Sequence, residues 1–198
     1  MKNKRLDVIK LFSDSFLSCS KEAQAYGKCI ISKTDLKKND CQKEFLEFYN
    51  CYSVKTLIIF KPDVIKSYHT LLKINKFIQK NNFSVVKSKW LQWSLSDAES
   101  FYKQHTKKFF HTRLSMHMSS DIIQAQILKY DRTGNCIEIF RNFLGNSKVY
   151  KSVNDFSIDT IRKRYALSDT RNAIHASDSY ESYLREAQFI FPGYELVK

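Results

Sequence analysis

The stretch Leu57-Ile58-Ile59-Phe60-Lys61-Pro62-Asp63 decides the fold of the larger part of the chain. Its first four residues form a short apolar run, which is typical of a buried strand, and the Lys-Pro-Asp that follows ends that strand. A helix-like pattern covers about residues 66–81, and residues 85–93 have the composition of a second strand. The larger part of the chain is therefore predicted to begin with a strand, a helix and a strand.

Helical patterns continue beyond this unit. Ser96 and Glu99 have the spacing of a capping box, in which two side chains satisfy the first free N–H groups of a helix. Phe110, Leu114 and Met118 recur at four-residue steps, as they would on one face of a second short helix. These two features predict a pair of helices between residues 96 and 118.

The next segment has the pattern of a β-hairpin. Apolar and polar side chains alternate over residues 123–127, which is typical of a half-buried strand. Asp131–Asn135 has the composition of a hairpin turn. Cys136–Ile139 is accordingly predicted to be the return strand.

The remaining elements are predicted to be helices. Arg141–Leu144 is expected to be short and capped by Gly145, and Asp178 and Glu181 have the spacing of a box that starts a last helix before Pro192. The order of elements predicts an α+β sandwich with a mainly antiparallel sheet, similar to a ferredoxin-type fold.

Composition narrows the class of partner. The chain has 198 residues, 43% of them hydrophobic, and no run of about 18 apolar residues, so no membrane-spanning helix is expected. Its net charge is +13, and most of the excess lies beyond residue 54. Such a charge favours phosphates, nucleic acid or anionic lipid as partners, or else reflects a solvated lysine-rich surface. No groove-reading motif is present, so nucleic acid is not expected to be a partner.

Four of the five cysteines form two pairs. Cys19 and Cys29, and Cys41 and Cys51, each enclose nine residues with a helical pattern. Because ten helical positions rise by about 15 Å, while a disulfide needs Cα atoms within about 7 Å, neither pair can close on itself. A polar turn between the two helices favours antiparallel packing, which predicts the bridges Cys19–Cys51 and Cys29–Cys41 and leaves Cys136 free. A zinc site is disfavoured by the spacing, and four unrelated free thiols are the simpler alternative.

The cysteine frame resembles the twin Cys-x9-Cys (CHCH) family of mitochondrial helical hairpins. Glu22-Ala-Gln-Ala-Tyr26-Gly27 and Glu44-Phe45 are similar to the corresponding positions of complex I assembly factor eight. The resemblance covers about residues 5–57 and implies a disulfide-stapled hairpin domain over residues 1–54. The basic N-terminal residues 1–16 fit either an import signal or, as the acidic Asp7 and Asp14 favour, a retained first helix.

A polar cluster near the C-terminus is the strongest candidate for a reactive site. Asp169-Thr-Arg171-Asn172-Ala-Ile-His175-Ala-Ser177-Asp178-Ser179 places a histidine in a predicted loop beside a helix start, where anions are favoured. An imidazole at such a place can act as a nucleophile toward phosphate. A hydrogen-bonded surface histidine is the plainer alternative.

The motif Arg171-Asn172-x-x-His175-x-Ser177-Asp178-Ser179, together with Lys61-Pro62-Asp63, resembles nucleoside diphosphate kinases, and the stretch Phe101–Leu114 is closest to their sixth, mitochondrial branch. The resemblance covers about residues 55–196 and implies a kinase-like domain over residues 55–198. It also implies transfer of a γ-phosphoryl group through the histidine.

The resemblance assigns roles to individual residues. His175 corresponds to the phosphorylated histidine, Glu186 to the carboxylate that orients its imidazole and Ser177 to the serine that supports this contact. Lys61 and Tyr102 correspond to the pair that reaches the phosphates and the polar wall of the site. The residues implied to bind nucleotide are Lys61, Phe110, Leu114, Arg141, Ser147, Arg162 and Asn172.

The resemblance implies Mg²⁺ bound with ATP or ADP as cofactor, and no protein side chain is predicted as a metal ligand. Ala176 and Lys163 replace glycines of the family pattern. A β-carbon at residue 176 could crowd the phosphate or alter the backbone, so weak or no turnover is expected. The loop around Lys163 builds subunit contacts in the family, so the usual hexamer is not expected.

Two functions follow. The first is a mitochondrial accessory or assembly subunit associated with a respiratory-chain complex, complex I above all, with a nucleotide-binding kinase-like domain. The alternative is an active nucleoside diphosphate kinase. Oxidised hairpins favour the intermembrane space, with the matrix as the alternative implied by the kinase branch, and a peripheral position on the inner membrane is expected.

Overall fold

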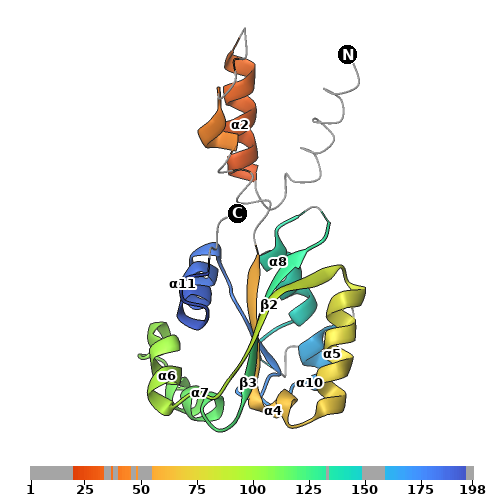
Figure 1. Ribbon diagram of the computed structural model, residues 1–198, viewed down its shortest axis with the longest axis vertical. Coiled ribbons are helices and arrows are strands. Elements are labelled where there is room, and N and C mark those ends of the chain that lie inside the picture. The colour runs from red at the N-terminus through yellow and green to blue at the C-terminus, as the bar shows by residue number, and fades with distance from the viewer. Residues whose placement is uncertain are drawn as a thin grey trace.

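The computed structural model describes residues 20–33, 37, 40–45, 48, 55–132, 134–148 and 159–194. Its centre is a four-stranded sheet in the order β2-β3-β1-β4 (Figure 1). The strands are β1 (Thr56–Phe60), β2 (Phe83–Leu91), β3 (Ile123–Tyr130) and β4 (Ile174–Ala176), and every neighbouring pair is antiparallel. The predicted α+β fold with an antiparallel sheet is confirmed.

Helices cover both faces of this sheet. In Figure 1, α6 (Leu95–Phe101), α7 (His111–Met118) and α11 (Tyr180–Ile190) lie to one side of it. The other side is covered by α5 and α10, and residues of α4 and α8 pack there as well. The bounds of these four helices are α4 Pro62–Ile65, α5 Tyr68–Lys80, α8 Cys136–Leu144 and α10 Ile161–Tyr165.

The apolar run that opens the domain is the fully buried strand β1. Because side chains alternate across a sheet, Leu57 and Ile59 enter the core beside α6, α7 and α11. Ile58 and Phe60 enter the core on the opposite face. A strand with helices on both faces needs apolar side chains at every position, which explains the unbroken run.

The predicted hairpin after β3 is wrong. Residues 136–144 form helix α8, and no return strand is present among the described residues of this region. The side chain of Asn135 accepts hydrogen bonds from the N–H groups of Ile137 and Glu138. This N-cap satisfies the free donors of the first turn. Buried apolar residues also recur with helical spacing along α8, whereas a return strand would alternate.

Helix starts are shifted by small amounts. Helix α6 is capped by Ser94 and Asp97, which form a reciprocal capping box, and the predicted box at Ser96 and Glu99 is wrong. Helix α11 is capped by the side chain of Ser179, one residue after the predicted Asp178. The predicted helix over about residues 66–81 is α5, which the Ser67 side chain caps, and the short helix α4 before it was not predicted. None of the described helices is long and apolar enough to cross a membrane.

The N-terminal region contains helix α2 (Ser20–Ser32) and the predicted disulfide Cys29–Cys41, which excludes a zinc site or free thiols at this pair. The Tyr26 ring lies 5.4 Å from that of Phe45, measured between ring centroids. Cys19, Cys51 and residues 1–16 lie outside the described residues, so the second bridge stays a prediction. Cys136 is a buried free thiol, as predicted.

Candidate active site

His175 lies at the centre of the candidate site, on strand β4. This strand pairs with β1, and His175 lies opposite Ile59. Its Nε2 atom is 3.0 Å from Oε2 of Glu186, and the Ser177 hydroxyl donates to the same oxygen over 2.7 Å. Strand β4 thus supplies the imidazole and α11 the carboxylate. The placement of His175 in a loop was wrong, because a three-residue edge strand is too short to give a recognisable pattern.

The carboxylate of Glu186 is buried yet remains charged. Burial alone raises the pKa of such a group, but His175, the hydrogen bonds from His175 and Ser177, and the nearby Arg185 together outweigh burial and hold the pKa of Glu186 below its usual value. A carboxylate that accepts a hydrogen bond from Nε2–H leaves the lone pair on Nδ1. The arrangement can therefore present Nδ1 as a nucleophile.

Aromatic rings from α6 and the turn after it form a wall beside His175. The ring centroids of Phe101 and Tyr102 lie 5.2 Å and 5.6 Å from that of the imidazole. The Tyr102 hydroxyl is buried and has no hydrogen-bond partner among the described residues. Burial, with a smaller effect of Glu186, raises the pKa of Tyr102 far above its usual value, so the phenol stays neutral. An orphan donor here fits a ligand oxygen.

Lys61 extends the site from the end of β1. Its ammonium donates to the carbonyl of Thr170 over 3.0 Å and to Oδ1 of Asn172 over 2.7 Å. The side chain is buried without a carboxylate in contact, and burial, helped by Arg162 and opposed by Asp63, lowers the pKa of Lys61 to about 7. A buried cation of this kind is stabilised when an anion binds beside it.

Two arginines lie next to this lysine. Arg162, at the start of α10, donates to the carbonyls of Asn172, Gly145 and Ile174 over 2.9–3.3 Å. Burial and the like charge of Arg141 lower the pKa of Arg162 to about 10. Because a guanidinium has five N–H donors, Arg162 fixes three chain segments and keeps donors for an anion. Arg141 is exposed and donates to the carbonyl of Ala176 over 3.3 Å.

The other predicted nucleotide-binding residues occupy different places. The Asn172 amide donates to the carbonyl of Ser147 over 3.1 Å, so these two residues adjoin Lys61. Phe110 is half-buried, and its ring centroid lies 5.6 Å from that of His105 at the aromatic wall. Leu114 packs partly against the core beneath α7. The structure thus places Asn172 and Ser147 beside Lys61, whereas Phe110 lies at the aromatic wall and Leu114 packs against the core.

A second histidine–carboxylate pair supports the site and was missed in the sequence. His117 Nε2 lies 2.8 Å from one carboxylate oxygen of Asp63, and the other oxygen accepts from the N–H of Ala173 over 3.1 Å. Ala173 has φ +70°, and Ile174 donates across it to the carbonyl of Asn172. This three-residue turn is strained for a residue with a side chain. The Asp of Lys-Pro-Asp was the available signal, but its partners lie 54 and 110 residues away.

The backbone at Ala176 contradicts the expected alteration of the backbone by its β-carbon. Ala176 lies in β4 opposite Ile58 and is 5% exposed. It is not among the non-glycine residues with positive φ, of which the described part of the chain has Cys41, Asn82 and Ala173. Its β-carbon is accommodated in extended backbone, so no glycine is required at this position.

The described residues contain no cluster of three histidine, cysteine or acidic side chains that could hold a metal ion. Lys61, Arg141 and Arg162 are instead grouped as a cationic site. This grouping of positive charges suits a polyanion, such as the phosphates of a nucleotide.

Comparison with known proteins agrees with this geometry. Residues 54–196 match the nucleoside diphosphate kinase family. The chain is 36% identical over 139 residues to nucleoside diphosphate kinase 6 of Xenopus tropicalis, covering 70% of this chain and 75% of that protein. It is 35% identical over 145 residues to the nucleoside diphosphate kinase of Paracoccus denitrificans, covering 72% of this chain and 96% of that protein.

A solved structure shows the same architecture. The Aquifex aeolicus nucleoside diphosphate kinase superposes with a TM-score of 0.63 at 31% sequence identity, covering 71% of this chain and 96% of that one. The chain therefore belongs to the nucleoside diphosphate kinase family.

Proposed function

We propose that this protein transfers the γ-phosphoryl group of a nucleoside triphosphate to a nucleoside diphosphate through phosphohistidine at His175. The observation that carries the proposal is the buried chain Ser177–Glu186–His175, with distances of 2.7 Å and 3.0 Å, which directs Nδ1 away from the carboxylate. The extended backbone at Ala176 supports the proposal, because it removes an altered backbone as a reason to expect weak turnover.

The reaction divides into two balanced halves. The Nδ1 lone pair attacks the γ-phosphorus, the bond from that phosphorus to the bridging oxygen breaks, and its electrons leave with the diphosphate. In the second half, a terminal oxygen of another diphosphate attacks the phosphohistidine and returns the electrons to Nδ1. Glu186 keeps the Nε2 proton in place and stabilises the positive charge on the imidazole during both halves.

The surrounding residues bind and neutralise the phosphates. The cations Lys61, Arg141 and Arg162 border the site, and the unpartnered Tyr102 hydroxyl offers a neutral donor. Phosphoryl transfer needs this positioning and charge stabilisation more than acid–base chemistry. Mg²⁺ bound with the nucleotide would supply further charge neutralisation, and Phe110 offers its ring to the base.

The test is labelling with γ-³²P ATP. The wild-type chain is expected to take up an acid-labile, base-stable label, and His175→Ala is expected to lose it while retaining the wild-type melting temperature without nucleotide. A wild-type protein that binds ATP but takes up no label would refute phosphoryl transfer and leave a nucleotide-binding domain.

A second function is favoured by one observation, the Cys29–Cys41 disulfide in the N-terminal helical region. We propose that this region attaches the chain to a respiratory-chain complex, complex I first, as a mitochondrial accessory or assembly subunit. The disulfide supports the intermembrane space over the matrix. Native electrophoresis of mitochondrial extracts tests this: co-migration that is lost in Cys29→Ser/Cys41→Ser but kept in His175→Ala is expected. Migration of the wild-type chain free of any complex would contradict it.

A further inference from the structure

Helix α7 carries three side chains along one stripe. Phe110, Leu114 and His117 have the spacing i, i+4 and i+7, which places them on one face of the helix. Phe110 is the N-cap, with its ring beside His105 at the aromatic wall, and His117 lies in the last turn. At 1.5 Å per residue, α7 therefore spans about 10 Å from the ring proposed to stack on the base to the contact between His117 and Asp63.

The contact of His117 with Asp63 is special to this helix. Among the residues that the structure describes, it is the one hydrogen bond or ion pair by which a side chain of α7 reaches another helix or strand. It is shielded from water, because only 11% of the His117 side chain and 3% of the Asp63 side chain are exposed. Burial alone raises the pKa of Asp63, but His117, the N–H of Ala173 and Lys61 together outweigh burial and hold this pKa below its usual value. The carboxylate is therefore charged.

Asp63 connects α7 with the strand that carries His175. Its second carboxylate oxygen accepts from the N–H of Ala173 over 3.1 Å, and the next two residues, Ile174 and His175, begin β4. The N–H of Lys61 donates to the Ala173 carbonyl over 3.0 Å, so the same turn adjoins the lysine of the site. One carboxylate thus holds α7 at one oxygen and the turn that places the imidazole at the other.

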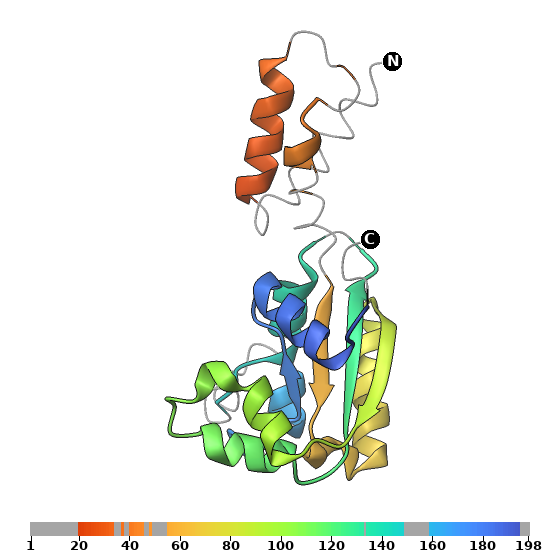
Figure 2. The ribbon, with the colours of Figure 1, turned by 60° about the vertical axis from the view of Figure 1, so that its left-hand side comes forward.

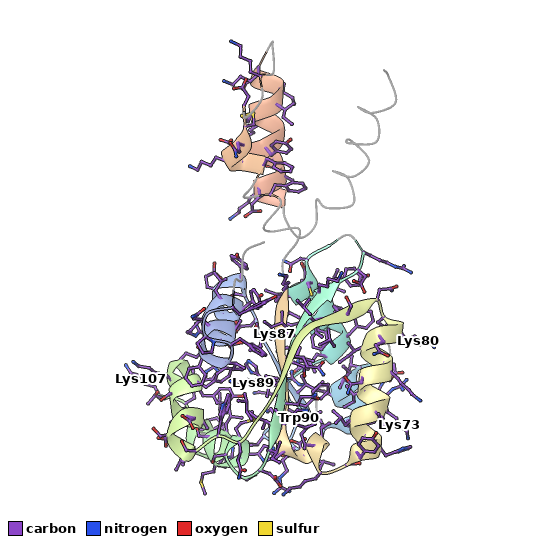
Figure 3. All side chains as sticks on the ribbon, in the orientation of Figure 1. Lys73, Lys80, Lys87, Lys89, Trp90 and Lys107 are labelled. Carbon is purple, nitrogen blue, oxygen red and sulfur yellow. A yellow bond between two sulfur atoms is a disulfide. The ribbon has the colours of Figure 1, made fainter. Side chains whose placement is uncertain are left out.

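The outer side of α7 faces solvent. Figure 2 shows the connection before it, residues 102–110, projecting away from the sheet. In Figure 3, Lys107 of this connection lies at the edge of the molecule, on the opposite side from Lys73 and Lys80 of α5. The position of α7 is therefore determined by its inner stripe and by the contact with Asp63.

We propose that His117 is a positioning residue that couples occupation of the base site to the reactivity of His175. A nucleotide whose base stacks on Phe110 fixes α7, and α7, through His117 and Asp63, fixes the turn before His175. Binding energy from a part of the substrate remote from the reacting atoms then serves to orient the nucleophile. This inference rests on the proposed function, and it assigns a role to a histidine that the proposed reaction does not use.

A purely structural contact is the competing interpretation. It predicts that removal of the His117 imidazole lowers the free energy of unfolding and slows every phosphoryl donor equally. A positioning role predicts a loss only for donors that carry a base, because a donor without a base leaves α7 unfixed in the wild-type protein as well.

The test compares ATP with ribose 5-triphosphate, which lacks the base, as γ-labelled donors in single-turnover labelling of the full chain. At saturation, ATP is expected to label wild-type protein faster than ribose 5-triphosphate does. His117→Phe keeps an aromatic ring but removes the N–H, and it is expected to lower the saturated rate with ATP by about 10- to 100-fold. The ATP concentration at half-maximal rate, and the saturated rate with ribose 5-triphosphate, are expected to change by less than about threefold. His117→Gln, whose amide can still donate to Asp63, is expected to restore most of the rate with ATP.

The surface pair of Asp121 and Lys66 provides the matched control. It joins the segment after α7 to the end of α4 over 3.5 Å, but its side chains are 40% and 64% exposed and it does not involve the turn at Ala173. Asp121→Asn is therefore expected to leave the rates with both donors unchanged. The melting temperature of each variant without nucleotide shows that it is folded.

Four results would overturn the proposal: equal saturated rates with the two donors in wild-type protein, equal loss with both donors in His117→Phe, no recovery in His117→Gln, or the same loss in Asp121→Asn. Each of these leaves phosphoryl transfer at His175 untouched, because His175 is still labelled. Absence of label in wild-type protein that binds ATP would instead refute the proposed function and this inference together.

Discussion

We predict that Asp63 holds the strained turn at Ala173, and with it the candidate site, in its observed conformation. Asp63 accepts from the Ala173 N–H, and the N–H of Lys61 donates to the Ala173 carbonyl over 3.0 Å. The two neighbours of the turn are Asn172, bonded to Lys61, and Ile174, the residue before His175. Removing the Asp63 carboxylate with Asp63→Ala should therefore let the turn relax and displace both site residues.

The magnitude follows from the strain at Ala173. A non-glycine residue at φ +70° costs about 1–3 kcal/mol relative to its preferred backbone. If the Asp63 contact opposes that cost, its loss lowers the population of the binding-competent turn by about 5- to 150-fold, and the apparent affinity for nucleotide falls by the same factor. The lost charge-assisted hydrogen bond should also lower the free energy of unfolding by about 1.5–3 kcal/mol.

The decisive variant is Ala173→Gly. Glycine adopts positive φ without strain, so Asp63→Ala/Ala173→Gly should recover most of the nucleotide affinity lost in Asp63→Ala. Asn82→Gly is the matched control, because Asn82 has φ +63° at the far end of α5 and does not adjoin the site. It should leave the affinity of Asp63→Ala unrecovered.

Titration calorimetry with ADP and Mg²⁺ measures the affinities, and urea unfolding measures the stabilities of the four variants in the cycle. The expected coupling between residues 63 and 173 exceeds about 1 kcal/mol in binding free energy. Effects that add within about 0.5 kcal/mol would show that the two residues act independently. The proposed control of the site by Asp63 would then be wrong.

Three further predictions concern charge and covalent structure. Glu186→Gln should slow labelling of His175 by about 100-fold without abolishing it, because the imidazole loses its orientation; an unchanged rate in a rapid-quench assay would contradict this. The folded-state pKa of Lys61, about 7 against 10.5 for the unfolded chain, means that the unfolded state binds more protons between these values. The contribution of Lys61 to the free energy of unfolding should therefore rise with pH through that window, and the affinity for ADP should fall above pH 7. Lys61→Met should remove both trends, which are measured by urea unfolding and by calorimetric titration. Trends that persist in Lys61→Met would exclude Lys61 as their source. Peptide mapping of non-reduced protein should find Cys19–Cys51 and Cys29–Cys41 linked and Cys136 unmodified until the chain is denatured; five reactive thiols would exclude both bridges.

Local patterns in the sequence predict most of the domain. The apolar run of β1 and the alternation in β3 lead directly to the antiparallel sheet. Helix α8 was mistaken for a strand because residues 131–135 have the composition of a turn, while the deciding N-cap of Asn135 is a single side chain whose hydrogen bonds form only in the helix. Local composition cannot separate these outcomes over so short a segment.

For the candidate site, too, the sequence predicts some residues and misses others. His175, Glu186 and Ser177 lie within twelve residues and follow one motif, so sequence spacing brings them together. The clamp of His117, Asp63 and Ala173 joins α7, the start of α4 and the turn before β4. Its members have no short-range pattern, and the positive φ of an alanine is determined by the tertiary structure around it.

The proposed reaction requires His175 to carry the phosphoryl group between two nucleotides. The most direct measurement is a chase: protein labelled with γ-³²P ATP is freed of nucleotide and mixed with unlabelled GDP and Mg²⁺. We expect close to one acid-labile phosphate per chain, mapped to His175, and its complete transfer to GDP, which forms labelled GTP. A label on any other residue, or a label on His175 that GDP cannot remove while GDP binds, would contradict it.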